Sequence, residues 1–383
     1  MYTNKYANLK NKDMHKKKII FSDNTLWAIF NFRGNVIKHF TDKGYEVIVI
    51  APEMEESEMQ GSVPDGIRLI QVKMERAKTN PFSDIAYFFR VLRIYHKEKP
   101  VYIFHYTIKP NIYGSIAAKL NGVRSSAMMA GLGYAFKNDS LVSKIARGLY
   151  KIGMKCTENL FLLNKENLSD ILRLKICNPK KITLLKGGEG VDLKHFGYTD
   201  NSSDDITFLF IGRILFEKGY NEFVECAKQI KKEYANVRFE ILGTLDPTYP
   251  NSVSKERLEE DVQSGTICYA GFVKDVRPIY ARKGIVVTLP SFYGEGLNRS
   301  LMEACATGKP IITTDIAGCR ETVEDGINGY CIPPKDSNAL IEAVRKYMNL
   351  TDEQRKKMSE ASRMLAEKRF DIDNVIDIYD RII

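Results

Sequence analysis

The chain has 383 residues, of which 44% are hydrophobic and 27% charged, a composition typical of a globular protein long enough for two domains. No apolar run approaches the roughly 20 residues of a bilayer-spanning helix, and the polar, basic residues 1–18 lack the apolar stretch of a secretory signal. Residues 1–190 carry a net charge of +14 (31 Lys and Arg, 17 Asp and Glu) and the remainder −5 (26 and 31), so we expect the two halves to have different partners.

Short runs of β-forming residues alternate with helical patterns along the first half of the chain. The expected strands are residues 18–22, 45–51, 101–105, 126–130 and 160–163, and the expected helices are residues 34–42, 84–96, 111–120 and 141–155. Gly34 is expected in a loop after the first strand, within residues 31–34 (NFRG), and His105 at the end of the third.

Three glycines within residues 186–192 (KGGEGVD) predict a hinge, after which the alternation restarts. The expected strands are now residues 207–211, 237–242, 266–269, 285–289 and 310–313, and the expected helices are residues 220–233, 299–307, 337–348 and 351–368. Alternating strands and helices predict an α/β fold with doubly wound parallel sheets, whose ligands lie beyond the carboxyl ends of the strands.

Residues 211–219 (IGRILFEKG) lie between an expected strand and an expected helix. Gly212 permits a tight turn at the strand end, and Arg213 and Lys218 place two cations beside a helix N-terminus. Such a combination favours a diphosphate site. Two ordinary surface cations would give the same pattern.

Residues 291–303 (SFYGEGLNRSLME) form a second glycine-bearing loop that leads into a helix. Glu295 lies between two glycines, and Glu303 follows eight positions later on the helix, so both carboxylates can face one ligand. Carboxylates accept strong hydrogen bonds from sugar and ribose hydroxyls, and a helix start can hold phosphate. A solvated helix face is the alternative interpretation of Glu303.

These segments together resemble glycosyltransferase family 4, a family of retaining enzymes with the GT-B architecture, including members that act in bacterial surface-polysaccharide assembly. The resemblance rests on the E-x7-E spacing from Glu295 to Glu303, on Gly212 and Arg213 with residues 217–219 (EKG), and on residues 270–275 (AGFVKD). Residues 308–310 (GKP), 315–322 (DIAGCRET) and 328–334 (NGYCIPP) follow in family order. Nearly the whole C-terminal half is covered.

The resemblance implies two Rossmann-like domains that face a central cleft. Residues 1–190 would form the acceptor domain and residues 191–365 the nucleotide-sugar donor domain, with a C-terminal helix at 366–383 packed back on the first domain. Arg213 and Lys218 would stabilise the departing nucleotide diphosphate, Glu295 and His105 would contact the transferred sugar, and Glu303 the ribose. The remaining donor-binding residues would be Gly34, Gly212, Phe272, Val273, Gly296, Leu297 and Asn298.

The implied reaction moves a hexose or N-acetylhexosamine from a nucleotide-diphosphate sugar, by resemblance a UDP-sugar, to a glycan or a lipid-diphosphate-linked sugar. A nucleotide-sugar epimerase of the same architecture and a catalytically silent nucleotide-sugar-binding protein remain alternatives. A nicotinamide dehydrogenase is disfavoured because the first strand is not followed by GxGxxG. A nucleic-acid partner is not expected, because the basic residues are not interleaved with stacking aromatics.

Two further expectations concern cofactors and location. The seven cysteines lie far apart without zinc-site spacing, so we expect reduced thiols in the cytoplasm and neither a metal nor another cofactor. The expected helix at 141–155 has Lys144, Arg147, Lys151 and Lys155 on one face. Such a helix can rest on an anionic membrane surface, which predicts a peripheral location on the inner face of the cell membrane. An ordinary amphipathic helix packed on a sheet is the alternative.

Overall fold

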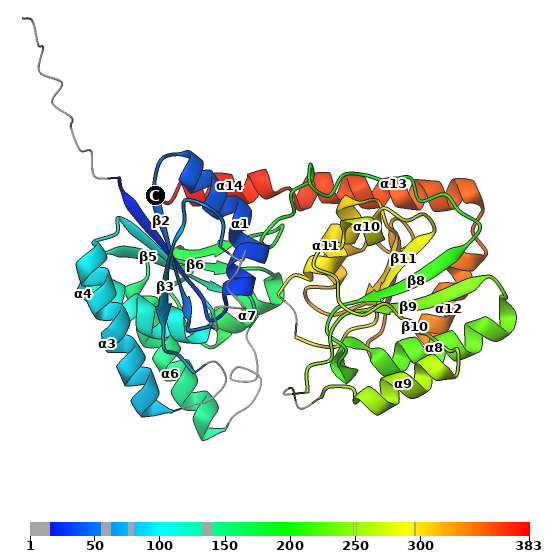
Figure 1. Cartoon of the computed structure of the whole chain (residues 1–383), viewed down its shortest axis with the longest axis horizontal. Helices are drawn as coiled ribbons and strands as arrows, with labels where there is room; N and C mark the ends of the chain where they lie inside the picture. Colours follow the sequence, from blue (N-terminus) through cyan, green and yellow to red (C-terminus); the bar gives the residue numbers. More distant parts are fainter. Residues whose placement is uncertain are drawn as a thin grey trace, which may run out of the picture.

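The computed structural model describes residues 16–54, 63–75, 80–131, 140–247, 249, 251–294 and 296–383. Figure 1 shows two lobes, each built around one sheet with helices on both faces. Every pair of neighbouring strands is parallel. The predicted fold class of two doubly wound parallel-sheet domains is confirmed.

The first sheet has the strand order β3-β2-β1-β4-β5-β6-β7. Its strands are β1 (Lys18–Ser22), β2 (Glu46–Pro52), β3 (Arg68–Val72), β4 (Tyr102–Tyr106), β5 (Arg124–Met129), β6 (Asn159–Leu162) and β7 (Ile182–Leu184). The central strands β1, β2 and β4 are buried on both faces, which explains why they appear in the sequence as continuous apolar runs.

Helices cover both faces of this sheet. They are α1 (Leu26–Asp42), α3 (Pro81–Glu98), α4 (Ser115–Leu120), α6 (Leu141–Cys156) and α7 (Lys165–Arg173), with a π-helical turn η1 (Pro110–Gly114) and a 3-10 turn η2 (Pro179–Lys181). α4 packs against both α3 and α6, so these three helices share one face of the sheet, and α1 covers the other (Figure 1).

α1 begins earlier than the sequence predicts. The hydroxyl of Thr25 accepts a hydrogen bond from the amide of Ala28, which caps the helix before Leu26. Gly34 therefore lies within the helix and not in a loop, and the space where its Cβ would lie is open. The expectation that Gly34 lies in a loop after β1 is wrong, because that loop consists of residues 23–25.

The second sheet has the strand order β10-β9-β8-β11-β12-β13. Its strands are β8 (Ile206–Ile211), β9 (Val237–Leu242), β10 (Cys268–Tyr269), β11 (Ile285–Leu289), β12 (Ile311–Thr314) and β13 (Gly329–Ile332). Its helices are α8 (Tyr220–Glu233), α9 (Lys255–Gln263), α10 (Arg277–Tyr280), α11 (Arg299–Ala306), α12 (Ser337–Met348) and α13 (Asp352–Arg369), with 3-10 turns η3 (Phe216–Lys218) and η4 (Arg320–Thr322).

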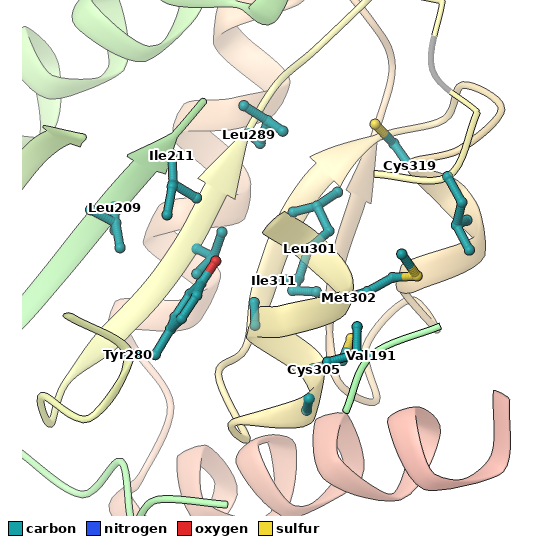
Figure 2. Close-up of a cluster of buried hydrophobic side chains, with 14 of the residues drawn as sticks. Val191, Leu209, Ile211, Tyr280, Leu289, Leu301, Met302, Cys305, Ile311 and Cys319 are labelled. Atoms are coloured by element: carbon teal, nitrogen blue, oxygen red, sulfur yellow. The ribbon is translucent and has the colours of Figure 1, made fainter. Parts of the chain in front are cut away.

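α11 is held by the apolar core of this domain. Figure 2 shows Leu301, Met302 and Cys305 of α11 in one cluster with Ile311 of β12 and Val191 of the segment that joins the domains. All five side chains are buried. This packing fixes the start of α11 relative to the ends of β8 and β11.

The chain crosses between the domains twice, and the two crossings lie side by side. After α13, helix α14 (Ile372–Asp380) returns to the first domain and packs on α1 (Figure 1). The amide of Ile372 donates to the carbonyl of Val191 at 3.1 Å. A Cβ on Gly187 would lie 1.9 Å from the carbonyl oxygen of Arg369, so the close approach of the crossings requires this glycine of the predicted hinge.

None of the helices within the described ranges is long and apolar enough to cross a bilayer.

Candidate functional site

Arg213 and Lys218 follow β8 and meet at one aromatic ring. The Arg213 guanidinium carbon lies 5.5 Å from the centroid of the Tyr293 ring, and the Lys218 Nζ lies 5.2 Å from it. Tyr293 belongs to the loop between β11 and α11, so the ring brings the two loops together. The two predicted cations are thus neighbours at the carboxyl edge of the second sheet.

Further contacts hold this cation pair in place. The Arg213 guanidinium also lies 5.2 Å from the Tyr249 ring centroid and 3.7 Å from a carboxylate oxygen of Asp246. Lys218 is 7% exposed, which is unusual for a lysine. The amide of Phe292 donates to the carbonyl of Glu217 at 2.8 Å, which ties the β11–α11 loop to η3.

The loop between β11 and α11 contacts the first domain. The amide Nδ2 of Asn164 donates to the carbonyl of Gly296 at 2.6 Å, and a Cβ on Gly296 would lie 1.7 Å from the carbonyl oxygen of Ala130. Leu297 is buried against Gly188 of the hinge segment. The predicted residues Gly296 and Leu297 therefore lie where the two domains meet.

Asn298 lies directly before α11, and Glu303 lies within it. The side chain of Asn298 caps the helix by accepting from the amide of Leu301 at 3.1 Å. Glu303 accepts from the Arg299 Nε at 2.7 Å, and Arg299 also donates to the carbonyl of Gly190 at 2.6 Å. Burial raises the pKa of Glu303, while Arg299 opposes this shift. Glu303 is thus part of a polar contact between α11 and the hinge segment.

The partner of Glu303 in the E-x7-E spacing, Glu295, lies outside the described residues. Its neighbours Gly294 and Gly296 are described, and Gly294 lies close to Gly131 of the first domain.

Phe272 and Val273 lie in the loop after β10, and Gly271, which precedes them, is linked to Gly212 through Gly243. The carbonyl of Gly271 accepts from the amide of Gly243 at 2.8 Å, and Gly243 lies against the carbonyl of Gly212. Phe272 is 58% exposed, whereas Val273 packs partly against the core. The sequence-predicted residues of the second domain that the structure describes are therefore gathered at the carboxyl edge of one sheet.

His105 does not face the second domain, contrary to the sequence-based expectation. Its ring is fully buried, with Nε2 3.1 Å from the Tyr95 hydroxyl and Nδ1 3.4 Å from the Ser115 hydroxyl. Alternate residues of β4 point to opposite faces, and His105 points to the face covered by α3 and α4. Burial lowers its pKa to about 3, so the ring is neutral near pH 7.

A buried ionic cluster at the hinge was not predicted. The Arg33 guanidinium lies 3.3 Å from the Asp23 carboxylate and 2.6 Å from the Glu189 carboxylate, and 4.2 Å from the Tyr106 ring centroid. Although burial lowers the pKa of Arg33, the two carboxylates outweigh this effect and raise it. Two features of the sequence could have indicated this cluster: Asp23 directly follows β1, and Glu189 lies between the glycines of the hinge.

Two family models match the chain. Residues 194–364 match the model of glycosyl transferases group 1, and residues 18–164 match a glycosyl transferase 4-like model. The hinge segment lies between the two matches.

Curated relatives are similar along most of their length. An N,N'-diacetylbacillosaminyl-diphospho-undecaprenol alpha-1,3-N-acetylgalactosaminyltransferase of Campylobacter jejuni is 27% identical over 379 residues, which cover 93% of this chain and 96% of the relative. A UDP-Gal:alpha-D-GlcNAc-diphosphoundecaprenol alpha-1,3-galactosyltransferase of Escherichia coli is 26% identical over 73% of this chain and 74% of its own.

Solved structures share the fold. A glycosyltransferase from Rickettsia africae superposes with a TM-score of 0.77 at 19% identity, covering 96% of this chain and 99% of the other. HepE of Anabaena, solved in complex with UDP and glucose, superposes with a TM-score of 0.74 at 15% identity, covering 95% and 98%.

Proposed function

Since the chain belongs to the glycosyltransferases of GT-B architecture that join a 4-like domain to a group 1 domain, we propose that it transfers a hexose or N-acetylhexosamine from a UDP-sugar to a lipid-diphosphate-linked sugar. The activities for which the Campylobacter and Escherichia relatives are named support this acceptor class, because both names specify a sugar linked to a diphospho-undecaprenol.

The observation that carries the proposal is the pair of cations at the carboxyl end of β8. Breaking the bond between the anomeric carbon and the diphosphate oxygen leaves negative charge on the nucleotide diphosphate. Arg213 and Lys218 both lie against the Tyr293 ring, so two positive charges are available to stabilise the negative charge of the leaving diphosphate. Charges fixed in advance stabilise a leaving group without reorganisation during the reaction.

The other residues have roles that follow from their places. Phe272 and Val273, in the loop after β10, would frame the nucleotide base, while Glu303 on α11 would bind the ribose once a ligand competes with Arg299. Glu295 is proposed to contact the transferred sugar. Gly296, Leu297 and Asn298 would hold the donor-binding loop against the first domain.

In the proposed reaction, an acceptor hydroxyl forms a bond to the anomeric carbon as the bond to the diphosphate breaks, and UDP leaves. The hydroxyl proton leaves with the diphosphate or passes to solvent. We propose that the anomeric configuration is retained. Nuclear magnetic resonance of the product, through the coupling constant of its anomeric proton, tests retention.

We further propose that the protein works at the inner face of the cell membrane. The acceptor class supports this, because a polyprenyl diphosphate is embedded in lipid. The excess positive charge of residues 1–190 supports it as well, since anionic lipids attract basic surfaces.

The deciding experiment incubates the purified protein with a panel of UDP-sugars and a short-chain lipid-diphosphate N-acetylhexosamine. We expect one UDP-sugar to give UDP and an acceptor heavier by one sugar in equal amounts, measured by coupled assay and mass spectrometry. Interconversion of two UDP-sugars without acceptor would instead establish an epimerase. Binding of UDP-sugars without release of UDP, for every acceptor offered, would favour a silent binding protein.

The proposal includes no metal, because two protein cations already face the expected diphosphate. Within the described residues, no group of three or more His, Cys, Asp or Glu side chains could hold a metal ion. We expect turnover to be the same with and without EDTA. Loss of turnover in EDTA that magnesium or manganese restores would overturn this part of the proposal.

A further inference from the structure

We propose that the first turns of α3 and α6 form a surface that docks on an anionic lipid bilayer. This surface, here called the docking surface, consists of Phe82, Ile85 and Phe89 of α3 and Leu141, Val142 and Ile145 of α6. The inference rests on the proposed function, because the acceptor lipid is what requires the enzyme at a membrane.

α6 has two apolar faces, only one of which is packed. Tyr150 and Met154 are buried against the sheet. Leu141, Val142 and Ile145 are 74%, 61% and 56% exposed, and they lie on one side of the helix because of their spacing. The amphipathic helix predicted from the sequence therefore does not use its apolar residues only for packing.

α3 repeats this arrangement. Tyr87 and Val91 are buried, whereas Phe82, Ile85 and Phe89 recur at spacings of three and four on the opposite side and are at least half exposed. Scattered apolar residues are normal on protein surfaces, but two helices on the same face of one sheet, both packed against α4, that each present a row are not.

Both rows lie at the same edge of the first domain. α3 follows β3 and α6 follows β5, so both helices begin near the carboxyl ends of parallel strands. Asp84 in the first turn of α3 pairs with Lys109 at 2.6 Å and accepts from the Tyr113 hydroxyl at 3.2 Å, which ties α3 to the segment after β4. Docking of these first turns would hold that ligand-binding edge against the lipid headgroups.

The charges beside the rows select an anionic partner. Lys144, Lys151 and Lys155 of α6 are exposed, and residues 141–156 contain no acidic residue. On α3, Arg93 and Lys97 are exposed about one to two turns behind Phe89. Lys144 lies beside the apolar row and the other cations lie further along the helices, an arrangement that suits acyl chains below anionic headgroups.

A second copy of the chain is disfavoured by the same charges. In a two-fold symmetric contact, identical faces meet, so the lysines of one α6 would face those of the other. Like charges brought together in an interface oppose association. A bilayer with anionic lipid can contact both features, because its acyl chains accept the apolar rows and its headgroups attract the cations.

Vesicle flotation of the full chain tests the proposal, with no donor or acceptor present. We expect binding to vesicles of phosphatidylcholine with about one third phosphatidylglycerol, little binding to phosphatidylcholine alone, and release by salt. Replacement of Lys144, Lys151 and Lys155 by Glu should weaken binding by about 100-fold or more. The matched control replaces Lys232, Lys346 and Lys368, which are exposed lysines of the second domain, by Glu.

The apolar rows are tested with Phe82→Ser, Leu141→Ser and Val142→Ser combined. The control combines Leu120→Ser, Ile327→Ser and Met364→Ser, which are similarly exposed but lie elsewhere. All six side chains are exposed, so circular dichroism and melting should be unchanged. The docking surface is refuted if the wild-type protein ignores anionic vesicles at low salt, or if the controls lose as much binding as the test variants.

A second readout separates this inference from the proposed function. The docking variants should transfer sugar to a water-soluble short-chain acceptor at the wild-type rate, but more slowly to an acceptor embedded in vesicles. A protein that binds anionic vesicles yet transfers sugar to no lipid-diphosphate acceptor would refute the proposed function and leave the docking surface supported. A dimer that the Lys→Glu variants dissociate would refute the lipid as occupant.

Discussion

At the scale of single residues, Tyr293 organises the candidate donor site. An aromatic face attracts cations, with an energy of roughly 0.5–1 kcal/mol at exposed sites. The ring thereby holds Arg213 and Lys218 near each other, although two like charges repel. A diphosphate offers far stronger charge-assisted hydrogen bonds than a ring does. The cations are therefore positioned by the ring and available to a bound donor.

Replacing either cation should lower turnover strongly. We expect Arg213→Ala and Lys218→Met to reduce kcat by about 10²–10³, the cost of removing one donor to a developing oxyanion. Methionine retains an apolar side chain of similar length in the buried position of Lys218 and removes only the charge. Lys232→Met is the control in the same domain, and steady-state UDP release is the measurement. Near-native turnover of both variants with the accepted donor would show that the leaving group is stabilised elsewhere.

His105 should affect stability and not catalysis. Its ring meets two buried hydroxyls, so we expect His105→Ala to lower the free energy of unfolding by about 1–3 kcal/mol and to leave kcat nearly unchanged. Urea unfolding and UDP release are the two measurements. A large fall in kcat at unchanged stability would restore the catalytic role expected from the sequence.

The same residue predicts a pH dependence of stability. Because its folded pKa of about 3 lies below the unfolded value of about 6.5, the unfolded state binds more protons between these pH values. Stability therefore falls as the pH falls from about 6.5 toward 3, by about 1.4 kcal/mol per pH unit from this group. Urea unfolding at pH 7 and pH 5 should show a smaller loss for His105→Gln than for the wild type. Equal losses would mean that His105 titrates normally.

At the scale of elements, the sequence predicts strands best where they are buried. β1, β2, β8 and β11 appear as apolar runs and lie where predicted, within one residue. β3 was not predicted, because four of its five residues are partly exposed and its pattern is weak. β7 has only three residues, too few to show a period. The sequence pattern predicts α1 too short, because Gly34 suggests a loop, whereas the side chain of Thr25 caps the helix before Leu26.

The site could be predicted in part for the same reason. Arg213, Lys218 and Asn298 follow strands or begin a helix, and parallel topology brings such positions together without any knowledge of packing. The face of the sheet to which His105 points depends on the register of β4. An error of one residue in the predicted register places the side chain on the opposite face. The role of Tyr293 depends on ring placement, which no sequence pattern records.

Gly34 provides a test of the corrected helix. Alanine is favoured over glycine in a helix interior by about 0.8–1.0 kcal/mol, and the position has open space for a Cβ. We expect Gly34→Ala to raise the free energy of unfolding by up to about that amount and to keep full activity. Gly122→Ala is the contrast, because its φ of +68° strains any other residue, so it should be destabilised. Loss of activity in Gly34→Ala would indicate a glycine needed for ligand approach.

At the scale of the whole molecule, the contact at Gly296 sets how closely the domains approach. The Cβ of Gly296→Ala would meet a backbone carbonyl that no side-chain rotation can move, so the domains must separate there. A misplacement of about 1 Å can cost about 10² in rate. We expect product formation to fall by about that factor and the radius of gyration in small-angle X-ray scattering to increase.

Gly197→Ala is the control for the Gly296→Ala substitution, because nothing lies within 4 Å of the position where the Cβ of residue 197 would be. It should resemble the wild type in both measurements. Full activity of Gly296→Ala would mean that the reaction does not need the domain approach seen in this structure.

Helix α14 has a consequence for how the protein is made. The Tyr379 ring of α14 stacks on Phe161 at 5.2 Å and its hydroxyl lies 3.0 Å from that of Tyr106, so α14 completes the core of the domain that is synthesised first. A ribosome adds about 5–20 residues per second, so the first domain emerges from it well before α14 has been made. While the second domain is translated, the aromatic side chains that α14 covers in the folded protein are therefore exposed. The domain that is translated first completes its core last.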